Sequence, residues 1–366
     1  MRSSRQFRRL IIFVVFYLAF CVTAGILLCD GSLRPARRPL TNDEEMSARQ
    51  LAADLDSNLS NAIISGRDGN PLRAWSIRPS QANDDAVILL HGLADNRFGM
   101  IGYARMFLRH GYRVLLPDAR AHGASGGAFA TYGLLERDDI HGWFDWLNAE
   151  VHPRCIFGFG ESMGAAQLLQ ALQRTQFCAV AAESPFSDFA EIAYDRMGQP
   201  FHVGPWFGRT FLWPVVETAF LRAEWKYKFN MREVSPEKIV SLSGVPVLLI
   251  HGQIDSNIPV RHSRRIHALD AKAVLWEVPR ADHCGAISVA PEEFDRRVIE
   301  WFASHSGRAD GATRTSIDPS LLHGQALKGV NPRTQHGAKA PLFHSTASVG
   351  VSRRVSLHAL SSVSGG

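Results

Sequence analysis

Six short apolar runs recur between residues 86 and 279 and look like buried strands. The runs occupy residues 86–90, 112–118, 154–159, 178–184, 245–250 and 273–279. Stretches with helical spacing follow the first three runs, at residues 98–109, 134–150 and 162–174. Strands that alternate with helices in this way usually pair in parallel. The pattern therefore predicts an α/β fold, with a mostly parallel central sheet flanked by helices.

A β-hairpin is predicted just before these runs. Residues 62–79 hold two strand-like stretches on either side of Asp68, Gly69 and Asn70, which are residues that favour tight turns. No internal repeat is visible along the chain. We assign the whole pattern to one domain of residues 39–303.

Residues 10–29 form an apolar segment long enough to cross a bilayer. They contain no charged residue, and twenty helical residues span roughly 30 Å of hydrocarbon. We therefore assign residues 1–38 to a single-pass membrane anchor with basic flanks. A cleaved signal peptide is the alternative, with a cleavage site at residues 22–24, but its apolar core usually holds only about 7–15 residues. A lipid-modified Cys29 is disfavoured by the bulky Leu28 before it.

The arginines beside this segment bear on its orientation. Four precede it, and three follow it before residue 39. Because positive residues favour the cytoplasmic side, the excess of one favours a cytoplasmic N-terminus and an extracytoplasmic domain.

The two ends of the chain hold most of its basic excess. Residues 304–366 are rich in Ser, Gly, Ala and His without periodicity, which predicts a disordered low-complexity tail. This tail and residues 1–38 together hold 14 of the 40 Lys and Arg but only 3 of the 35 Asp and Glu. Residues 39–303 therefore hold 26 basic and 32 acidic side chains, a net charge of −6. This excludes a nucleic-acid partner, because the basic excess lies outside the folded domain.

The five cysteines predict neither a disulfide framework nor a metal site. They are Cys21 and Cys29 in the apolar segment, Cys155 and Cys178 at the start of two predicted strands, and the isolated Cys284. No spacing such as C-x-x-C occurs. We expect packed free thiols, with no metal and no organic cofactor.

A serine flanked by glycines stands directly after the strand predicted at residues 154–159. Gly160-Glu161-Ser162-Met163-Gly164 matches the pattern G-x-S-x-G at a strand-to-helix turn. Such a turn strains the serine backbone, and glycines two positions away avoid clashes with the strand and the helix. A helix-capping serine is the structural alternative. As a nucleophile, Ser162 would require a base, an acid and donors for an oxyanion.

Candidates for the acid and the base follow two later strands. Asp255 lies in the loop after residues 245–250, and His283 lies in the loop after residues 273–279. Loops that follow parallel strands converge at one edge of an open sheet. We therefore expect Asp255 and His283 to lie close to Ser162.

With these residues the chain resembles the α/β-hydrolase family, in particular its esterase-like branch related to prolyl-oligopeptidase and monoacylglycerol-lipase-type serine hydrolases. The resemblance covers about residues 60–303 and includes the order Ser, Asp, His and the segments LLHGLADNR, PDARAHGASGG and TYGLLERDD. Ala121 is a departure, because glycine is usual there. The resemblance implies a Ser162–Asp255–His283 triad. It also implies an oxyanion hole made by the backbone N–H groups of Leu93 and Met163.

Other polar residues near these motifs receive structural interpretations. His91, His122 and His251 are each followed directly by glycine, and we expect them to stabilise loops. We expect Asp118 and Arg120 to fix a loop by hydrogen bonds. We expect Asp282 to be solvated. Cys284 does not stand in a glycine-flanked turn of the kind that presents a nucleophile.

Residues 186–243 interrupt the alternation of strands and helices and are expected to form a helical cap over the active site. Nine of the chain's 35 aromatic residues lie within residues 201–230: Phe201, Trp206, Phe207, Phe211, Trp213, Phe220, Trp225, Tyr227 and Phe229. Two interpretations stay open. The aromatic residues form a core inside the cap, or they form a surface that binds acyl chains or touches a membrane.

Together these features predict a membrane-anchored serine hydrolase that cleaves carboxylic esters through an acyl-enzyme. The expected partners are a small or lipophilic ester and the membrane. A peptidase or an acyltransferase with the same triad is an alternative. A non-catalytic interaction module is a third reading, which an intact triad disfavours.

Overall fold

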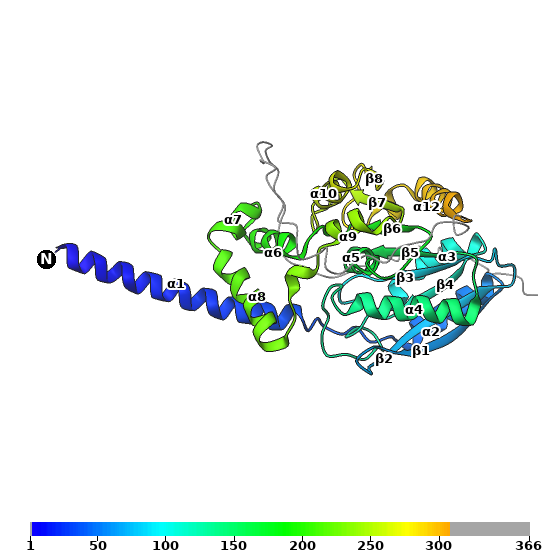
Figure 1. Ribbon diagram of the computed structural model, residues 1–366, viewed down its shortest axis with the longest axis horizontal. Helices are drawn as coiled ribbons and strands as arrows, with labels where there is room; N and C mark the ends of the chain where they lie inside the picture. The colour runs from blue at the N-terminus through cyan, green and yellow to red at the C-terminus, as the bar shows by residue number, and fades with distance from the viewer. Residues whose placement is uncertain (1, 308–366) are drawn as a thin grey trace, which may run out of the picture.

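The fold is built on one eight-stranded sheet (Figure 1). The computed structural model describes residues 2–307, with side chains from residue 4 onward. The strand order is β1-β2-β4-β3-β5-β6-β7-β8. The strands are β1 (Ser57–Ser65), β2 (Pro71–Pro79), β3 (Ala86–Leu90), β4 (Arg113–Pro117), β5 (Ile156–Glu161), β6 (Val180–Glu183), β7 (Val247–Gly252) and β8 (Val274–Val278). The predicted tail lies in part beyond residue 307, outside the described residues.

The strand pairing is antiparallel at one edge and parallel elsewhere. β1 and β2 form the predicted hairpin, and β2 also pairs antiparallel with β4. The other five pairings are parallel. The predicted mostly parallel α/β fold is thus confirmed. The carboxyl ends of β3, β5, β7 and β8 lie at one edge of the sheet, as the parallel pairing requires.

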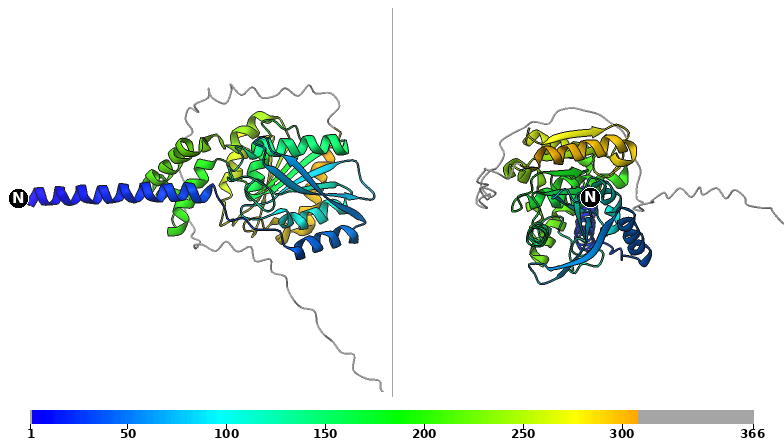
Figure 2. Two further views of the ribbon diagram at one scale, coloured as in Figure 1. Left: turned by 90° about the horizontal axis from the view of Figure 1, so that it is seen from below. Right: turned by 90° about the vertical axis from the view of Figure 1, so that its right-hand side faces the viewer.

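Helices cover both faces of the sheet (Figures 1 and 2). On one face lie α2 (Asn42–Asp54), η1 (Arg97–Met100), α3 (Ile101–Arg109), α11 (Ala286–Val289) and α12 (Pro291–His305). On the other lie α4 (Glu136–Val151), α5 (Ser162–Ala171), α9 (Pro236–Ser243) and α10 (Arg261–Leu269). Phe302 stacks on Phe107 and Phe157 in the first layer, at centroid distances of 5.6 and 4.5 Å. Each face therefore has its own hydrophobic core.

A disulfide joins Cys155 to Cys178. Their Cα atoms are 5.8 Å apart, and they stand 23 positions apart in sequence. The expectation of free thiols is wrong for this pair, because β5 and β6 are neighbouring strands and both cysteines stand just before them. Cys21, Cys29 and Cys284 are free.

Residues 186–243 fold mainly into helices. These are α6 (Phe189–Gly198), η2 (Gln199–Phe201), α7 (Pro205–Thr210), α8 (Trp213–Tyr227), η3 (Met231–Glu233) and α9. α9 packs in the sheet-covering layer with α5 and α10. The others form a group beside the carboxyl edge, whose buried residues join Met163 in one hydrophobic cluster. We call α6 to α8, with η2 and η3, the cap.

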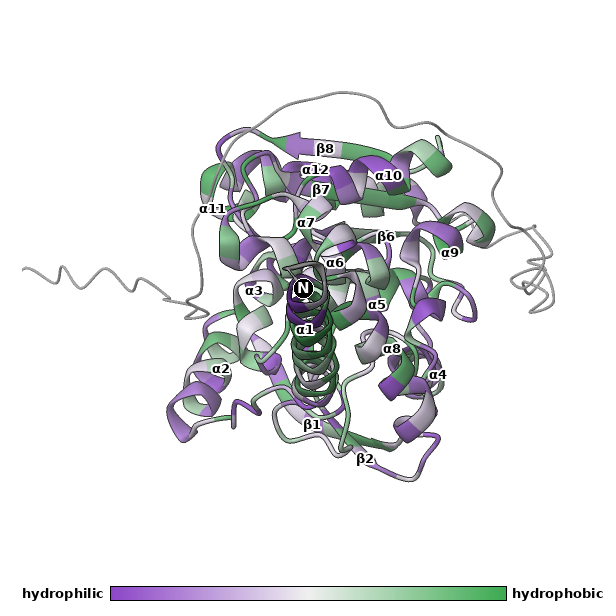
Figure 3. Cartoon of the chain, turned by 90° about the vertical axis from the view of Figure 1, so that its left-hand side faces the viewer, coloured by the Kyte–Doolittle hydropathy of each residue, from purple (hydrophilic) through white to green (hydrophobic). Residues whose placement is uncertain are grey.

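A long N-terminal helix, α1 (Arg2–Ser32), projects from the cap side of the domain (Figure 2). Residues 4–32 of this helix are the one helical segment among the described residues that is long and apolar enough to cross a membrane. Figure 3, a view down α1, shows hydrophobic residues over most of the helix. Its carboxyl-terminal half packs against α8. The helix is therefore both a candidate span and a packing partner of the cap.

Candidate active site

Ser162 lies at the junction of β5 and α5 with a φ of 51°, a left-handed conformation that is rare for residues other than glycine. The two glycines of the pattern make this turn possible. A Cβ at Gly160 would lie 2.7 Å from the carbonyl carbon of Gly164, and a Cβ at Gly164 would lie 2.3 Å from the carbonyl oxygen of Leu90. Any larger residue would push the helix away from β3 and β5. The turn therefore holds the Ser162 hydroxyl at the carboxyl edge of the sheet.

The His283 ring lies between Ser162 and Asp255. Its Nε2 atom is 2.8 Å from Ser162 Oγ, and its Nδ1 atom is 2.9 Å from Asp255 Oδ2. Asp255 is buried, and its Oδ1 atom also accepts hydrogen bonds from the N–H groups of Asn257 (2.9 Å) and Ile258 (2.7 Å). The structure thus brings together the three residues that the sequence singled out, over separations of 121 and 28 residues. In this arrangement His283 can accept a proton from the serine while Asp255 fixes the ring.

The Asp255 carboxylate stays charged in its buried position. Burial alone would raise its pKa, but hydrogen bonds and charge from His251 and His283 hold the pKa well below the usual range. A charged Asp255 accepts the Nδ1–H of His283, which leaves Nε2 as the atom that faces Ser162.

Two residues support this arrangement through contacts that the sequence did not predict. The hydroxyl of Ser184, just after β6, donates to Asp255 Oδ2 at 2.8 Å, and Ser184 has a φ of 50°. Asp282 Oδ1 accepts from the N–H groups of Ser256 and His283, each at 2.8 Å. Asp282 is exposed as expected, yet it ties the loop of Asp255 to the loop of His283. The one sequence signal for Ser184 and Asp282 was that each follows a strand by a few residues.

The two predicted oxyanion donors come from different elements. Met163 is buried in the first turn of α5, and Leu93 follows β3 and is exposed. A Cβ built on Gly92 would lie 3.7 Å from Ser162 Cβ, so the loop after β3 packs directly against the serine. Within the described loops and turns, neither N–H group donates a backbone hydrogen bond. Both are thus available to a ligand at Ser162.

An acidic pair, of which Glu183 is buried and Glu161 partly buried, lies at the ends of β5 and β6 next to the serine. Glu161 and Glu183 are directly opposite each other on β5 and β6. Glu183 accepts hydrogen bonds from the Tyr103 hydroxyl (2.8 Å) and the Ala286 N–H (3.0 Å). Burial, followed by the charges of Glu183 and Asp95, raises the pKa of Glu161 to about 8. Glu161 therefore carries a proton at neutral pH.

The other histidines of the motifs have structural partners. His91 accepts from the Ala119 N–H at Nε2 and donates from Nδ1 to the Gly92 carbonyl. His251 bonds to the Ser263 hydroxyl and the Ile258 carbonyl. Burial and the neighbouring His91 lower the pKa of His122 to about 4, so it stays neutral. His91 and His251 thus hold loops near the site, as expected, and His122 contacts the Arg120 carbonyl through Nδ1 (2.9 Å).

Asp118 and Arg120 also fix the loop in which they lie. Asp118 accepts from the Arg97 backbone and guanidinium, both at 2.7 Å. Arg120 makes a two-pronged bond to Asp139 and a further one to Asp68. These pairs connect the segment after β4 to α4 and to the hairpin turn.

A second Ser–His–Asp group lies between the cap and α10. Ser187 Oγ is 3.0 Å from His262 Nδ1, and His262 Nε2 is 2.8 Å from Asp195 Oδ2. Ser187 and His262 are fully buried, and the Ser187 N–H also points at His262 Nδ1. Ser187 does not stand in a glycine-flanked turn. The hydrogen bonds of this group link α6 to α10.

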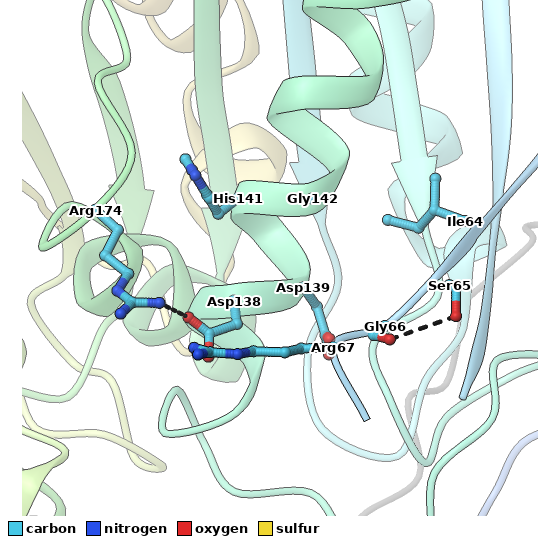
Figure 4. Close-up of a pocket in the computed structure, with 9 residues that line it drawn as sticks. All are labelled: Ile64, Ser65, Gly66, Arg67, Asp138, Asp139, His141, Gly142 and Arg174. Atoms are coloured by element: carbon cyan, nitrogen blue, oxygen red, sulfur yellow. Dashed lines mark hydrogen bonds and ion pairs between the residues drawn. The ribbon is translucent and has the colours of Figure 1, made fainter. Parts of the chain in front are cut away.

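A surface pocket of about 350 Å³ lies apart from these residues (Figure 4). It is lined by the ends of β1 and α4, and Asp138 there pairs with Arg67 and Arg174. Its lining includes none of Ser162, Asp255 and His283. Within residues 2–307, no group of three or more His, Cys, Asp or Glu side chains is arranged to hold a metal ion.

Solved structures with the same fold include esterases and peptidases. The esterase Pf2001 of Pyrococcus furiosus aligns with a TM-score of 0.57 at 25% identity, over 75% of this chain and 98% of the esterase. The acylaminoacyl peptidase of Pyrococcus horikoshii aligns with a TM-score of 0.52 at 19% identity, over 73% of this chain and 44% of the peptidase. The second likeness shows the fold alone.

Three curated relatives match between about half and three quarters of the chain. YqkD of Bacillus subtilis is 29% identical over 56% of this chain and 66% of its own length. YfhR of Escherichia coli K12 is 25% identical over 76% of this chain and 88% of its own. The lysophosphatidylserine lipase ABHD12 of Macaca fascicularis is 28% identical over 52% of this chain and 47% of its own. The model of the alpha/beta hydrolase family matches residues 87–297. Since that match spans more than half of the sequence, this chain belongs to the alpha/beta hydrolase family.

Proposed function

We propose that this protein is a serine hydrolase that cleaves carboxylic esters through an acyl-enzyme on Ser162. The observation that carries the proposal is the 2.8 Å contact between Ser162 Oγ and His283 Nε2, with Asp255 on the other ring nitrogen. A serine hydroxyl is a poor nucleophile at neutral pH unless a base accepts its proton. The buried Ser187 group lacks the exposed turn that a substrate would need.

The reaction runs in two halves. Ser162 Oγ attacks the ester carbonyl while its proton passes to His283 Nε2, and Asp255 stabilises the imidazolium. The Leu93 and Met163 N–H groups bind the oxyanion. Collapse breaks the bond to the alkoxy group, which takes the proton from His283 and leaves as the alcohol. Water then attacks the acyl-serine with His283 again as base, and the acid departs as Ser162 is restored.

Esters are favoured over amides by the relatives. Pf2001 is an esterase and ABHD12 is a lipase, both at 25% identity or more. A peptidase or an acyltransferase would use the same three residues. A chain-length series of p-nitrophenyl esters, tested beside peptide anilides and acceptor alcohols, separates these activities. Faster cleavage of anilides than of esters would favour a peptidase, and loss of all turnover would favour a non-catalytic module.

We also propose that α1 anchors the protein as a single-pass membrane helix, with the hydrolase domain on the extracytoplasmic side. Its apolar segment and the arginines before it support the anchor. The Cys155–Cys178 disulfide supports the location, because structural disulfides form mainly in oxidising compartments. A helix of this kind near the N-terminus also occurs in signal sequences. The packing of α1 on α8 favours retention.

A further inference from the structure

α1 and α8 run side by side and in parallel. The Tyr17 hydroxyl donates to the carbonyl of Phe211, just before α8. Further along, Gly25 packs so closely that a Cβ there would lie 2.5 Å from the Val215 carbonyl oxygen and 2.6 Å from Thr218 Cβ. Cys21 and Cys29, four residues on either side of Gly25, are buried. Small residues at this spacing let two helix backbones approach closely.

Polar contacts close the pair at its other end. Arg222 makes a two-pronged bond to Asp30 at 2.9 and 2.7 Å, and the Tyr227 hydroxyl bonds to the same carboxylate at 2.7 Å. Arg34 lies over the Tyr227 ring. The charged end of α8 is therefore level with the end of the apolar segment of α1, where a headgroup layer would lie.

The depth of the cap follows from this register. If residues 10–29 fill the hydrocarbon, Cys29 lies near one surface of the bilayer. Tyr17 is twelve residues nearer the N-terminus, which corresponds to about 18 Å along the helix. That distance exceeds half of a hydrocarbon core of roughly 30 Å. Any part of the cap level with Tyr17 would then lie within the acyl chains rather than on top of them.

The part of the cap near this level carries exposed aromatic residues. Phe201, Trp206, Phe211 and Trp213 are each 51–58% exposed. The Trp206 ring contacts the Phe211 ring at a centroid distance of 6.2 Å. The Phe207 ring contacts both of these rings and also the ring of Phe201. We call these five residues the aromatic end of the cap. Exposed aromatic groups of this size usually mark a surface with a partner.

Charged side chains near the aromatic end are paired. Arg209 on α7 forms an ion pair with Glu191 and lies over the Tyr194 ring. Glu217 on α8 is bound by Arg232 and by the Tyr194 hydroxyl. Pairing lowers the cost of placing such groups in or near hydrocarbon.

We propose that the aromatic end of the cap inserts into the acyl-chain region of the bilayer beside the carboxyl-terminal half of α1. The partner of this surface is the lipid bilayer. The insertion rests on the membrane span proposed above, since α1 sets the depth. The cap shares one hydrophobic cluster with Met163, the residue after Ser162, so the inserted surface and the candidate site belong to one packed unit.

Depth-dependent quenching of tryptophan fluorescence tests the insertion. The full-length protein is reconstituted in phosphatidylcholine vesicles whose acyl chains carry bromine near their midpoint. Trp206 and Trp213 should be quenched, so the double variant Trp206→Phe and Trp213→Phe should lose most of the quenching. Trp225→Phe is the matched control. Trp225 is exposed like the others but lies next to Lys226, at the charged end of α8. Its variant should keep the quenching of the wild type.

Two results would overturn the insertion. Quenching that is absent, or that survives in the double variant, places the aromatic end outside the acyl chains. If the same sample still needs detergent for extraction and still cleaves a soluble ester, the proposed function stands and only the insertion fails. If the protein is released by alkaline carbonate, the span fails and the insertion fails with it.

Discussion

The hydroxyl of Ser184 donates a hydrogen bond of 2.8 Å to Oδ2 of Asp255, the oxygen that also faces His283. Asp255 is thus held from two sides, by Ser184 and by the N–H groups after it in its own loop. A hydroxyl at the end of β6 therefore helps to position a carboxylate that follows β7.

Ser184→Ala should lower kcat about tenfold and leave KM nearly unchanged. One hydrogen bond to a charged group contributes about 1.5 kcal/mol, and its loss frees Asp255 to turn away from His283. Steady-state kinetics on a soluble ester measure the split. Ser187→Ala is the control, because Ser187 is equally buried and bonds to a histidine outside the site. A rise in KM without a fall in kcat would contradict the positioning role.

A fluorophosphonate probe should label Ser162 and no other residue. Ser162→Ala should abolish both labelling and esterase activity, because the probe requires an activated serine. The matched variant Ser187→Ala removes the serine of the other Ser–His–Asp group and should label like the wild type. Mass spectrometry of the labelled peptide identifies the site. Undiminished labelling of the Ser162→Ala protein would refute the assignment.

Asp255→Asn and His283→Ala should each lower kcat by about 10³-fold or more, with the fold intact. Adding Ser162→Ala to either variant should cost little more, because residues that act as one unit give non-additive losses. Circular dichroism checks the fold, and kcat values of single and double variants test the coupling. Strictly multiplicative losses would show that the three residues act independently.

Glu161→Gln should make the protein more stable at alkaline pH. The pKa of Glu161 is raised to about 8, so the folded state keeps a proton that an ordinary glutamate releases near pH 4.5. Stability therefore falls as pH rises between these values, and the loss is complete above pH 8. Glutamine mimics the protonated form. We expect similar Tm values near pH 4.5 and a Tm higher by about 5 °C at pH 8.5. Glu150→Gln, at an exposed position, should follow the wild type. A Tm difference between Glu161→Gln and the wild type that does not change with pH would contradict the raised pKa of Glu161.

The full-length protein should remain in the membrane fraction after washing with salt and alkaline carbonate, and detergent should release it. Protease added to intact spheroplasts should digest the hydrolase domain. Peptide mapping without reduction should recover Cys155 linked to Cys178. A domain that is protected until the membrane is opened would show the opposite orientation. Release of the protein without detergent would show that α1 is not a membrane anchor.

Much of this molecule could be predicted from local sequence. Apolar runs of strand length, such as residues 86–90, specify buried parallel strands wherever helices can cover them. The turn at Ser162 was also predictable, because glycines at 160 and 164 suit only a tight junction of strand and helix. The roles of Asp255 and His283 stay a prediction, although parallel strands alone would place them near Ser162.

Tertiary structure decided what depends on neighbours distant in sequence. The disulfide depends on β5 and β6 lying side by side, and no spacing motif announces it. The support of Asp255 by Ser184 depends on backbone turns that residue type leaves open. The aromatic residues of the cap look alike in sequence, yet Phe220 is buried while Trp206 and Trp213 are exposed. Hydrophobic burial has no direction along the chain, so the packing of the cap, in which Phe220 contacts Phe189, decides which of them face outward.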